Sequence, residues 1–171
     1  MNESQSVKHP FPPLYDENSR VLILGSFPSV KSREQMFFYG HPQNRFWRVL
    51  AAVFASETPQ TIAEKRRFLL SHGIALWDVI ASCEITGSAD SSIKNAVAND
   101  LSPILAAADI RQIFVNGKTA EKFYRKYTEP VTGRAAICLP STSPANAAWS
   151  MERLIAAWQH VQEAMRADSD I

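Results

Sequence analysis

Apolar runs and amphipathic stretches alternate along most of this chain. Residues 20–25 form an aliphatic and β-branched run closed by a glycine, which is typical of a strand buried on both faces. Comparable runs predict three further strands, at 74–80, 112–115 and 135–139. The other segments predict helices at 43–55, 59–71, 101–107, 118–127 and 151–166. This order predicts an α/β fold, a three-layer α/β/α sandwich with a four-stranded parallel sheet and right-handed crossovers.

Prolines and polar residues mark the remaining segments. Residues 1–19 contain three closely spaced prolines, so we expect an extended N-terminal lead that packs against the body without regular structure. Thr58 is expected to cap the helix at 59–71. The polar stretch 83–92 has no packing periodicity and predicts a long loop, either functional or mobile.

Length and composition predict one domain covering residues 1–171, because 171 residues with 46% hydrophobic content can bury a single ample core. No stretch approaches the ~20 apolar residues of a membrane span, and the polar start lacks a secretory signal. We therefore expect a monomeric cytoplasmic protein. Cys83 and Cys138 are too few for an iron–sulfur cluster and are interpreted as buried free thiols.

Charge and histidine spacing limit the possible partners. The net charge of +1 does not predict a long phosphate track, so any contact with nucleic acid must be local. The basic triplet 65–67 lies mid-helix and is interpreted as a solvated face. His9, His72 and His160 are too dispersed for a zinc motif, and we expect neither a metal nor a cofactor.

The loop after the first strand is the most informative segment. Ligands of open α/β sheets bind beyond the carboxyl ends of the strands, which places Ser26, Phe27, Pro28 and Ser29 at a candidate site. The glycines of a phosphate-cradling loop are missing. A nucleophile elbow is also excluded, because a phenylalanine follows Ser26 where a small residue is required.

Three segments resemble the uracil-DNA glycosylase superfamily, and within it the branch that removes hypoxanthine from deoxyinosine in DNA. LILGSFPSVKSRE (22–34) resembles the first-strand loop, and LPSTSPANA (139–147) resembles the second catalytic loop. FYGHPQNRFW (38–47) resembles a signature shared with mismatch-specific uracil glycosylases. The resemblance covers nearly the whole chain. It implies DNA with a deaminated base as the partner, hydrolysis of the N-glycosidic bond and no cofactor.

Two residues of the middle signature carry the implied chemistry. Such an enzyme extrudes the target nucleotide into a pocket, and the resemblance places Tyr39 against the flipped base, unless it is a core aromatic. Asn44 is the predicted catalytic residue, because a neutral amide can hold a water and aim it at the anomeric carbon. The alternative makes Asn44 the N-cap of the helix at 43–55.

The base pocket is predicted from Ser26, Phe27, Pro28 and Tyr39 together with two strand-end residues. Asp78 is a carboxylate in an apolar strand and so needs a partner or a shifted pKa. By resemblance it orients the base or assists the water; otherwise it caps a neighbouring loop. Asn116 either faces the pocket or makes the turn after its strand.

The predicted DNA contacts lie mainly in the loop after the last strand. They are Ser29, Lys31, Arg45, Ser141, Thr142, Ser143, Pro144 and Ala145. Ser141 and Ser143 are expected to bind phosphate, and the rigid Pro144 and Ala145 to fill the gap left by the extruded base. Relatives commonly place a histidine or asparagine where Leu139 stands. This departure suggests that main-chain N–H groups at 26–29 stabilise the departing base.

Two other functions remain open at this point. Uracil is an alternative substrate, because a stacking ring and an amide-rich site would serve a pyrimidine too. A non-catalytic flavodoxin-like module that binds a nucleotide at the same strand ends is an alternative from another class.

Overall fold

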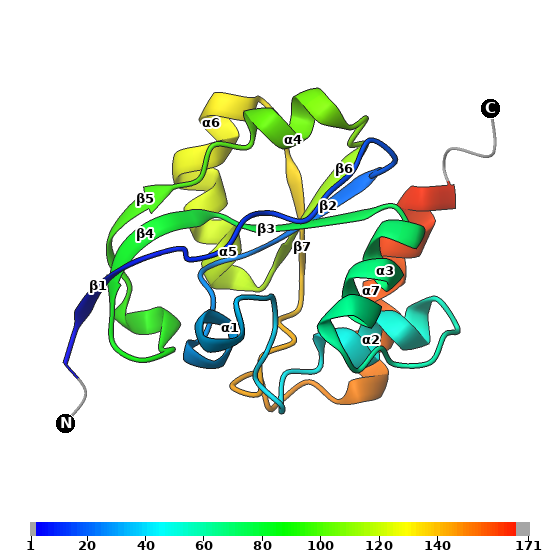
Figure 1. The fold of residues 1–171 in the computed structure, drawn as a ribbon, viewed down its shortest axis with the longest axis horizontal. Helices are drawn as coiled ribbons and strands as arrows, with labels where there is room; N and C mark the ends of the chain where they lie inside the picture. The colour runs from blue at the N-terminus through cyan, green and yellow to red at the C-terminus, as the bar shows by residue number, and fades with distance from the viewer. Residues whose placement is uncertain (1–2, 167–171) are drawn as a thin grey trace.

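The computed structural model describes residues 3–166 and contains a central parallel sheet between two layers of helices (Figure 1). Its strand order is β3–β2–β6–β7, and every neighbouring pair is parallel. These strands are β2 (Val21–Gly25), β3 (Ile74–Asp78), β6 (Gln112–Asn116) and β7 (Ala136–Leu139). β2 and β3 are buried along their whole length, as their continuous apolar runs require. The predicted four-stranded parallel sheet is confirmed.

Helices cover both faces of this sheet (Figure 1). One face carries α2 (Phe46–Val53), α3 (Ile62–Ser71) and α7 (Met151–Arg166). The other face carries α4 (Ser102–Ala107), α5 (Lys118–Phe123), a π-helical turn η2 (Tyr124–Thr128) and α6 (Glu129–Thr132). Trp158 of α7 is fully buried and meets Phe46 of α2 edge-on at 5.8 Å. The predicted three-layer sandwich is therefore confirmed.

Helix boundaries differ from the sequence expectations at turns. α2 begins only at Phe46, because residues 41–45 form a hydrogen-bonded turn. The expected cap Thr58 is wrong: Thr61 caps α3 and forms a capping box with Glu64. α1 (Val30–Gln35) follows β2 and was not predicted from its polar sequence. The Ser29 side chain caps this helix, since it accepts a hydrogen bond from Ser32 N.

A second, antiparallel sheet contains β1 (Gln5–Lys8), β4 (Ile80–Ile85) and β5 (Lys94–Ala98), in the order β1–β4–β5. The strand predicted at 74–80 divides at Val79, and β4 extends into the predicted loop at 83–92. A 3-10 turn, η1 (Asp90–Ser92), forms the last three residues of that predicted loop. That loop is therefore largely ordered.

The N-terminal lead is paired along the sheet edge, so the expectation of no regular structure is wrong for this segment. β1 pairs with β4, His9 N donates to Ala81 O at 2.7 Å, and Leu14 exchanges two backbone hydrogen bonds with Leu76 of β3. Residues 1–2 of the predicted lead lie outside the described residues. The lead covers the edge of β3 and buries Phe11 and Leu14.

Both cysteines are free; Cys83 is buried and Cys138 is half-buried. Burial raises the pKa of each thiol. Within residues 3–166, no helix is both long and apolar enough to cross a bilayer.

Candidate active site

The predicted site residues come from the carboxyl ends of neighbouring parallel strands. β2 ends at Gly25 beside Asp78 at the end of β3, and β6 ends at Asn116 beside Leu139 at the end of β7. The turn before α2 and the loop after β7 meet beyond this edge, where Arg45 N donates to Thr142 O at 3.0 Å. Segments far apart in the sequence therefore converge at one edge of the sheet, as the topology predicts.

Tyr39 is held rigidly at this edge. Its half-buried ring stacks on Phe46 with centroids 3.9 Å apart and an interplanar angle of 15°. Its backbone has a φ of 51°, in the left-handed region, and its carbonyl accepts a hydrogen bond from Trp47 Nε1 at 3.2 Å. Among the described residues, Phe46 is the only aromatic ring against it. The structure thus presents a fixed ring with one face packed.

The Tyr39 hydroxyl meets polar groups from two strands. It accepts a hydrogen bond from Asn116 Nδ2 at 3.3 Å. Burial raises the pKa of this hydroxyl far above its usual value, and the negative charges of Asp78 and Asp90 raise it further, against the hydrogen bond from Asn116. The hydroxyl therefore stays protonated and can donate to a ligand.

Asn116 joins the tyrosine to the loop after β7. Its Nδ2 also donates to Thr142 Oγ1 at 3.0 Å, and its Oδ1 accepts from Thr142 N at 3.1 Å. The turn itself is made by Gly117, whose φ is 94°. The Asn116 side chain therefore bonds Tyr39 and the loop after β7, and its contact with a base stays a prediction.

Asp78 is buried and lies against Gly25. A Cβ on Gly25 would stand 2.5 Å from Asp78 Oδ1 and 3.1 Å from the Tyr39 hydroxyl, so only glycine fits there. The other carboxylate oxygen, Oδ2, lies 2.7 Å from His9 Nε2. The buried carboxylate thus has the partner that its burial predicts. That partner is His9 of the N-terminal lead, which the sequence analysis considered only as a zinc ligand.

Asn44 is half-buried in the turn that precedes α2. Its Oδ1 accepts a hydrogen bond from Phe46 N at 3.0 Å, and its own N donates to His41 O at 3.0 Å. His41 fixes the same turn, since its Nδ1 accepts from Gln43 N at 3.1 Å. The N-cap residue of α2 is Arg45 and not Asn44, and it makes no side-chain capping bond. Asn44 instead holds the turn before the helix, through one hydrogen bond from Phe46 N. This bond leaves Oδ1 a second lone pair and leaves the amide N–H groups without a bond to a described residue.

The first loop is bound to the polar segment 86–92. Ser26 Oγ donates to Asp90 Oδ1 at 3.0 Å, and Arg33 Nη2 donates to Gly87 O at 3.1 Å. Burial of the Asp90 carboxyl group raises its pKa, against the hydrogen bond from Ser26, which lowers it, and the negative charge of Asp78 raises it further. The sequence places Arg33 among the basic residues near the loop edge, but it does not predict the bond from Arg33 to Gly87 or the bond from Ser26 to Asp90, because both join distant loops.

The remaining residues of the first loop are less accessible than predicted. Phe27 and Pro28 are buried, and Phe27 packs edge-on toward His9 at 6.0 Å. Ser29 Oγ is engaged with Ser32 at the start of α1. A contact of Phe27 and Pro28 with a base stays a prediction.

The loop after β7 is rigid, as its prolines and serines predict. Ser143 N donates to Ser141 Oγ, and Ala145 N donates to Ser143 Oγ, each at 3.1 Å. Asn146 Nδ2 donates to Ser141 O at 2.9 Å. Pro144 and Ala145 are exposed at the tip. The hydroxyls of Ser141 and Ser143 only accept hydrogen bonds within the loop, so their predicted donation to phosphate stays a prediction.

Arg45 holds this loop in place. Its guanidinium donates to three carbonyls, at 2.5 Å to Trp149 O, 3.0 Å to Asn146 O and 3.3 Å to Ser143 O. A half-buried arginine with three such bonds is a structural tether in this structure. Its predicted contact with phosphate remains untested. Lys31, by contrast, is exposed, with Nζ 3.5 Å from Glu34 Oε2.

This contrast gives a prediction for two single variants. Arg45→Gln is expected to lower the free energy of unfolding by about 1.5–3 kcal/mol, because charged donors to buried carbonyls are lost. Lys31→Gln should leave stability unchanged but reduce the salt dependence of DNA binding by about one phosphate contact. Urea unfolding measures the free energy of unfolding of each variant, and a titration of DNA affinity against salt concentration measures the number of phosphate contacts. An Arg45→Gln variant of normal stability with a smaller salt slope would instead support direct phosphate binding.

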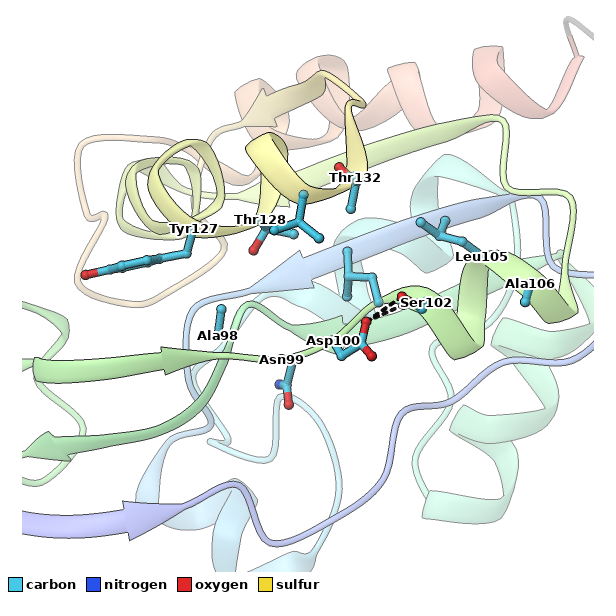
Figure 2. Close-up of a pocket in the computed structure, with 11 residues that line it drawn as sticks. Ala98, Asn99, Asp100, Ser102, Leu105, Ala106, Tyr127, Thr128 and Thr132 are labelled. Carbon is cyan, nitrogen blue, oxygen red and sulfur yellow. Dashed lines mark hydrogen bonds between the residues drawn. The ribbon is translucent and has the colours of Figure 1, made fainter.

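A cavity of about 580 Å³ lies elsewhere, between residues 98–106 and residues 127–132 (Figure 2). None of the predicted site residues lines it. The Asp100 carboxylate at its wall is already engaged, because Oδ1 accepts from Ser102 N at 2.9 Å and from Ser102 Oγ at 2.6 Å. The candidate site at the strand ends is therefore separate from this cavity. Within residues 3–166, no group of three or more potential metal ligands comes together.

The fold and the strand-end residues define an α/β protein that presents a stacking ring, an amide and a buried carboxylate at the carboxyl edge of a parallel sheet. The family model of the Uracil DNA glycosylase superfamily matches residues 12–162. The chain belongs to this superfamily, which confirms the resemblance stated above.

Two archaeal relatives share much of the sequence. The chain is 36% identical over 152 residues to a protein named hypoxanthine DNA glycosylase from Methanosarcina acetivorans, covering 86% of this chain and 93% of the relative. It is 35% identical over 119 residues to a protein of the same name from Methanosarcina barkeri, covering 68% and 75%.

A solved structure shows the same fold. The solution NMR structure of a candidate uracil DNA glycosylase from Methanosarcina acetivorans superposes with a TM-score of 0.76 at 32% identity. The similarity covers 92% of this chain and 99% of that protein.

Proposed function

We propose that this protein hydrolyses the N-glycosidic bond of deoxyinosine in DNA, releasing hypoxanthine and leaving an abasic site. The observation that carries the proposal is the Tyr39 ring, packed on one face by Phe46 and set between Asp78 and Asn116 at the strand ends. Such a ring is a platform for an extruded base, with polar groups placed to read the base edge. The names of the two archaeal relatives support hypoxanthine as that base.

In the proposed reaction, the deoxyinosine nucleotide leaves the duplex and its base stacks on Tyr39. Extrusion costs a few kcal/mol and costs least for a weakly paired base, which favours a deaminated nucleotide. As the bond to the base lengthens, positive charge develops on the sugar. Asn44 Oδ1 accepts a hydrogen bond from the attacking water through the lone pair that Phe46 N leaves available. The water oxygen bonds to the anomeric carbon as the bond to the base nitrogen breaks, and the electron pair of that bond goes to the base. The proton that the water loses passes through solvent to the departing base, which is released as neutral hypoxanthine.

The departing base requires stabilisation that Leu139 cannot supply. This side chain is 1% exposed and carries no polar atom. We assign the task to the main-chain N–H groups of Ser26, Phe27 and Ser29, because Pro28 has no N–H. The exposed loop tip at Pro144 and Ala145 would occupy the space that the extruded nucleotide vacates.

Duplex and single-stranded oligonucleotides with one deoxyinosine, one deoxyuridine or only normal bases test this proposal. Alkali-labile breaks are expected at deoxyinosine and not at normal bases. Breaks at deoxyuridine alone would make uracil the substrate. No break at either lesion, in either strand state, would contradict the glycosylase proposal and favour a binding module. A monomeric state and a cytoplasmic location remain predictions, and sedimentation and cell fractionation test them.

A further inference from the structure

His9 has no role in the proposed reaction, yet it forms a buried pair with Asp78. The His9 side chain is 3% exposed and the Asp78 side chain is 6% exposed, with Nε2 and Oδ2 2.7 Å apart. The histidine arrives on the paired N-terminal lead, directly after β1. Burying a polar pair this deeply costs free energy of folding, so its presence indicates a role in the structure or at the site.

Aromatic rings fix the His9 imidazole in one orientation. Trp77 and Phe11 lie closest, with ring centroids 4.3 Å and 4.5 Å from that of His9. Phe27 from the first loop and Phe38, next to Tyr39, complete the enclosure at 6.0 Å and 6.4 Å. The imidazole therefore cannot turn away from Asp78 without displacing four rings that include neighbours of the site.

The hydrogen bonding of His9 favours one tautomer. Nδ1 is buried and has no partner, so a proton on Nδ1 would leave an N–H donor buried and unpaired. With the proton on Nε2, Nδ1 carries only a lone pair, and Nε2–H donates to Asp78 Oδ2. In this arrangement His9 is neutral and Asp78 is an ionised hydrogen-bond acceptor.

The second oxygen of Asp78 faces the site. Oδ1 lies beside Gly25 and the Tyr39 hydroxyl at the sheet edge, and no described residue donates a hydrogen bond to it. The other charged or titratable groups near this carboxylate are Tyr39 and Asp90, and Asp90 adds negative charge rather than a donor. Oδ1 is not among the buried side-chain atoms that lack a partner, so it stays accessible and can accept a hydrogen bond from a ligand that enters the site.

Resting on the proposed function, we infer that His9 is a positioning residue that binds Asp78 Oδ2 and so fixes the direction of Oδ1, which accepts a hydrogen bond from N1–H of hypoxanthine. Hypoxanthine carries a proton on N1, whereas adenine has an unprotonated N1 at the same place. An ionised Asp78 thus pairs with the deaminated base and opposes the normal base, acceptor against acceptor. The pair selects against adenine, the base from which hypoxanthine arises by deamination.

Two variants of His9 separate this role from packing. His9→Phe keeps a ring in the aromatic enclosure but removes the donor to Asp78. His9→Gln gives up the ring but its Nε2 can donate to Oδ2. Asp78→Asn is the complementary change: with its carbonyl oxygen bound by His9, its amide turns an N–H donor toward the base and suits the unprotonated N1 of adenine.

The test measures kcat/KM for release of hypoxanthine and of adenine from matched oligonucleotides, with thermal unfolding of every variant. We expect His9→Phe to lower hypoxanthine release by about 10–100-fold, and His9→Gln to recover most of it, because one charged hydrogen bond is lost or kept. Asp78→Asn should raise the adenine-to-hypoxanthine ratio by at least about tenfold.

Three outcomes would overturn the inference. One is an unchanged adenine-to-hypoxanthine ratio in Asp78→Asn. Another is a His9→Gln variant that folds but is no more active than His9→Phe. That result would indicate that His9 only packs against its neighbours. The third is a wild type that releases no hypoxanthine, which contradicts the proposed function itself. The first two leave the proposed function intact, so the two failures are distinguishable.

Discussion

Asn44→Ala is expected to lower the rate of base release by about 10²–10⁴-fold, the usual range for a group that activates the attacking water. DNA affinity should stay close to that of the wild type, because the substitution removes no charged group and leaves the Tyr39 ring in place. Single-turnover kinetics on a deoxyinosine duplex measure the rate, and fluorescence anisotropy measures the affinity.

The control for Asn44 is Asn44→Ser, because the wild-type amide also accepts a hydrogen bond from Phe46 N. A serine hydroxyl can keep that turn but is too short to hold the water. We expect Asn44→Ser to unfold near the wild-type temperature and to be as slow as Asn44→Ala. If Asn44→Ser is nearly as active as the wild type, Asn44 serves only to hold the turn before α2.

Tyr39→Ala has the second large expected effect. Stacking of a base on an aromatic ring is worth about 1–3 kcal/mol, so kcat/KM should fall by about 5–150-fold. The variant should also be less stable, since the ring covers the fully buried Phe46. Steady-state kinetics and thermal unfolding, carried out well below the melting temperature of the variant, measure the two effects separately.

Tyr39→Phe is the matched variant for the ring. It keeps the stacking surface and removes only the hydroxyl that meets Asn116. We expect it to retain much more activity than Tyr39→Ala, with a moderate loss assigned to the hydroxyl. Equal activity of Tyr39→Ala and the wild type would remove the stacking role.

The elements predicted well from sequence are those buried by regular patterns. β2 is buried at every position, and α7 shows its buried residues Leu154, Trp158 and Val161 at three- and four-residue steps, so period and burial agree. β1 was missed because Gln5–Lys8 is an exposed edge strand with no apolar alternation. Its structure comes from backbone pairing with β4, which local sequence does not encode.

The site was predictable only as far as topology reaches. Asp78 and Asn116 could be found because strand ends of a parallel sheet share an edge. The His9 contact with Asp78 spans 69 positions, and the bond from Arg45 to Trp149 spans 104. Such contacts depend on how the lead and the last loop pack. A buried carboxylate in an apolar strand was the available signal that a partner existed.

The most direct test of the account is a paired measurement on one deoxyinosine duplex. Free base is identified by liquid chromatography and mass spectrometry, and abasic sites are counted in the same sample with an aldehyde-reactive probe. The account predicts free hypoxanthine and abasic sites in equal amounts with the wild-type protein, and a greatly reduced yield of both with Asn44→Ala. DNA that stays intact, with no free hypoxanthine at any protein concentration, would contradict it.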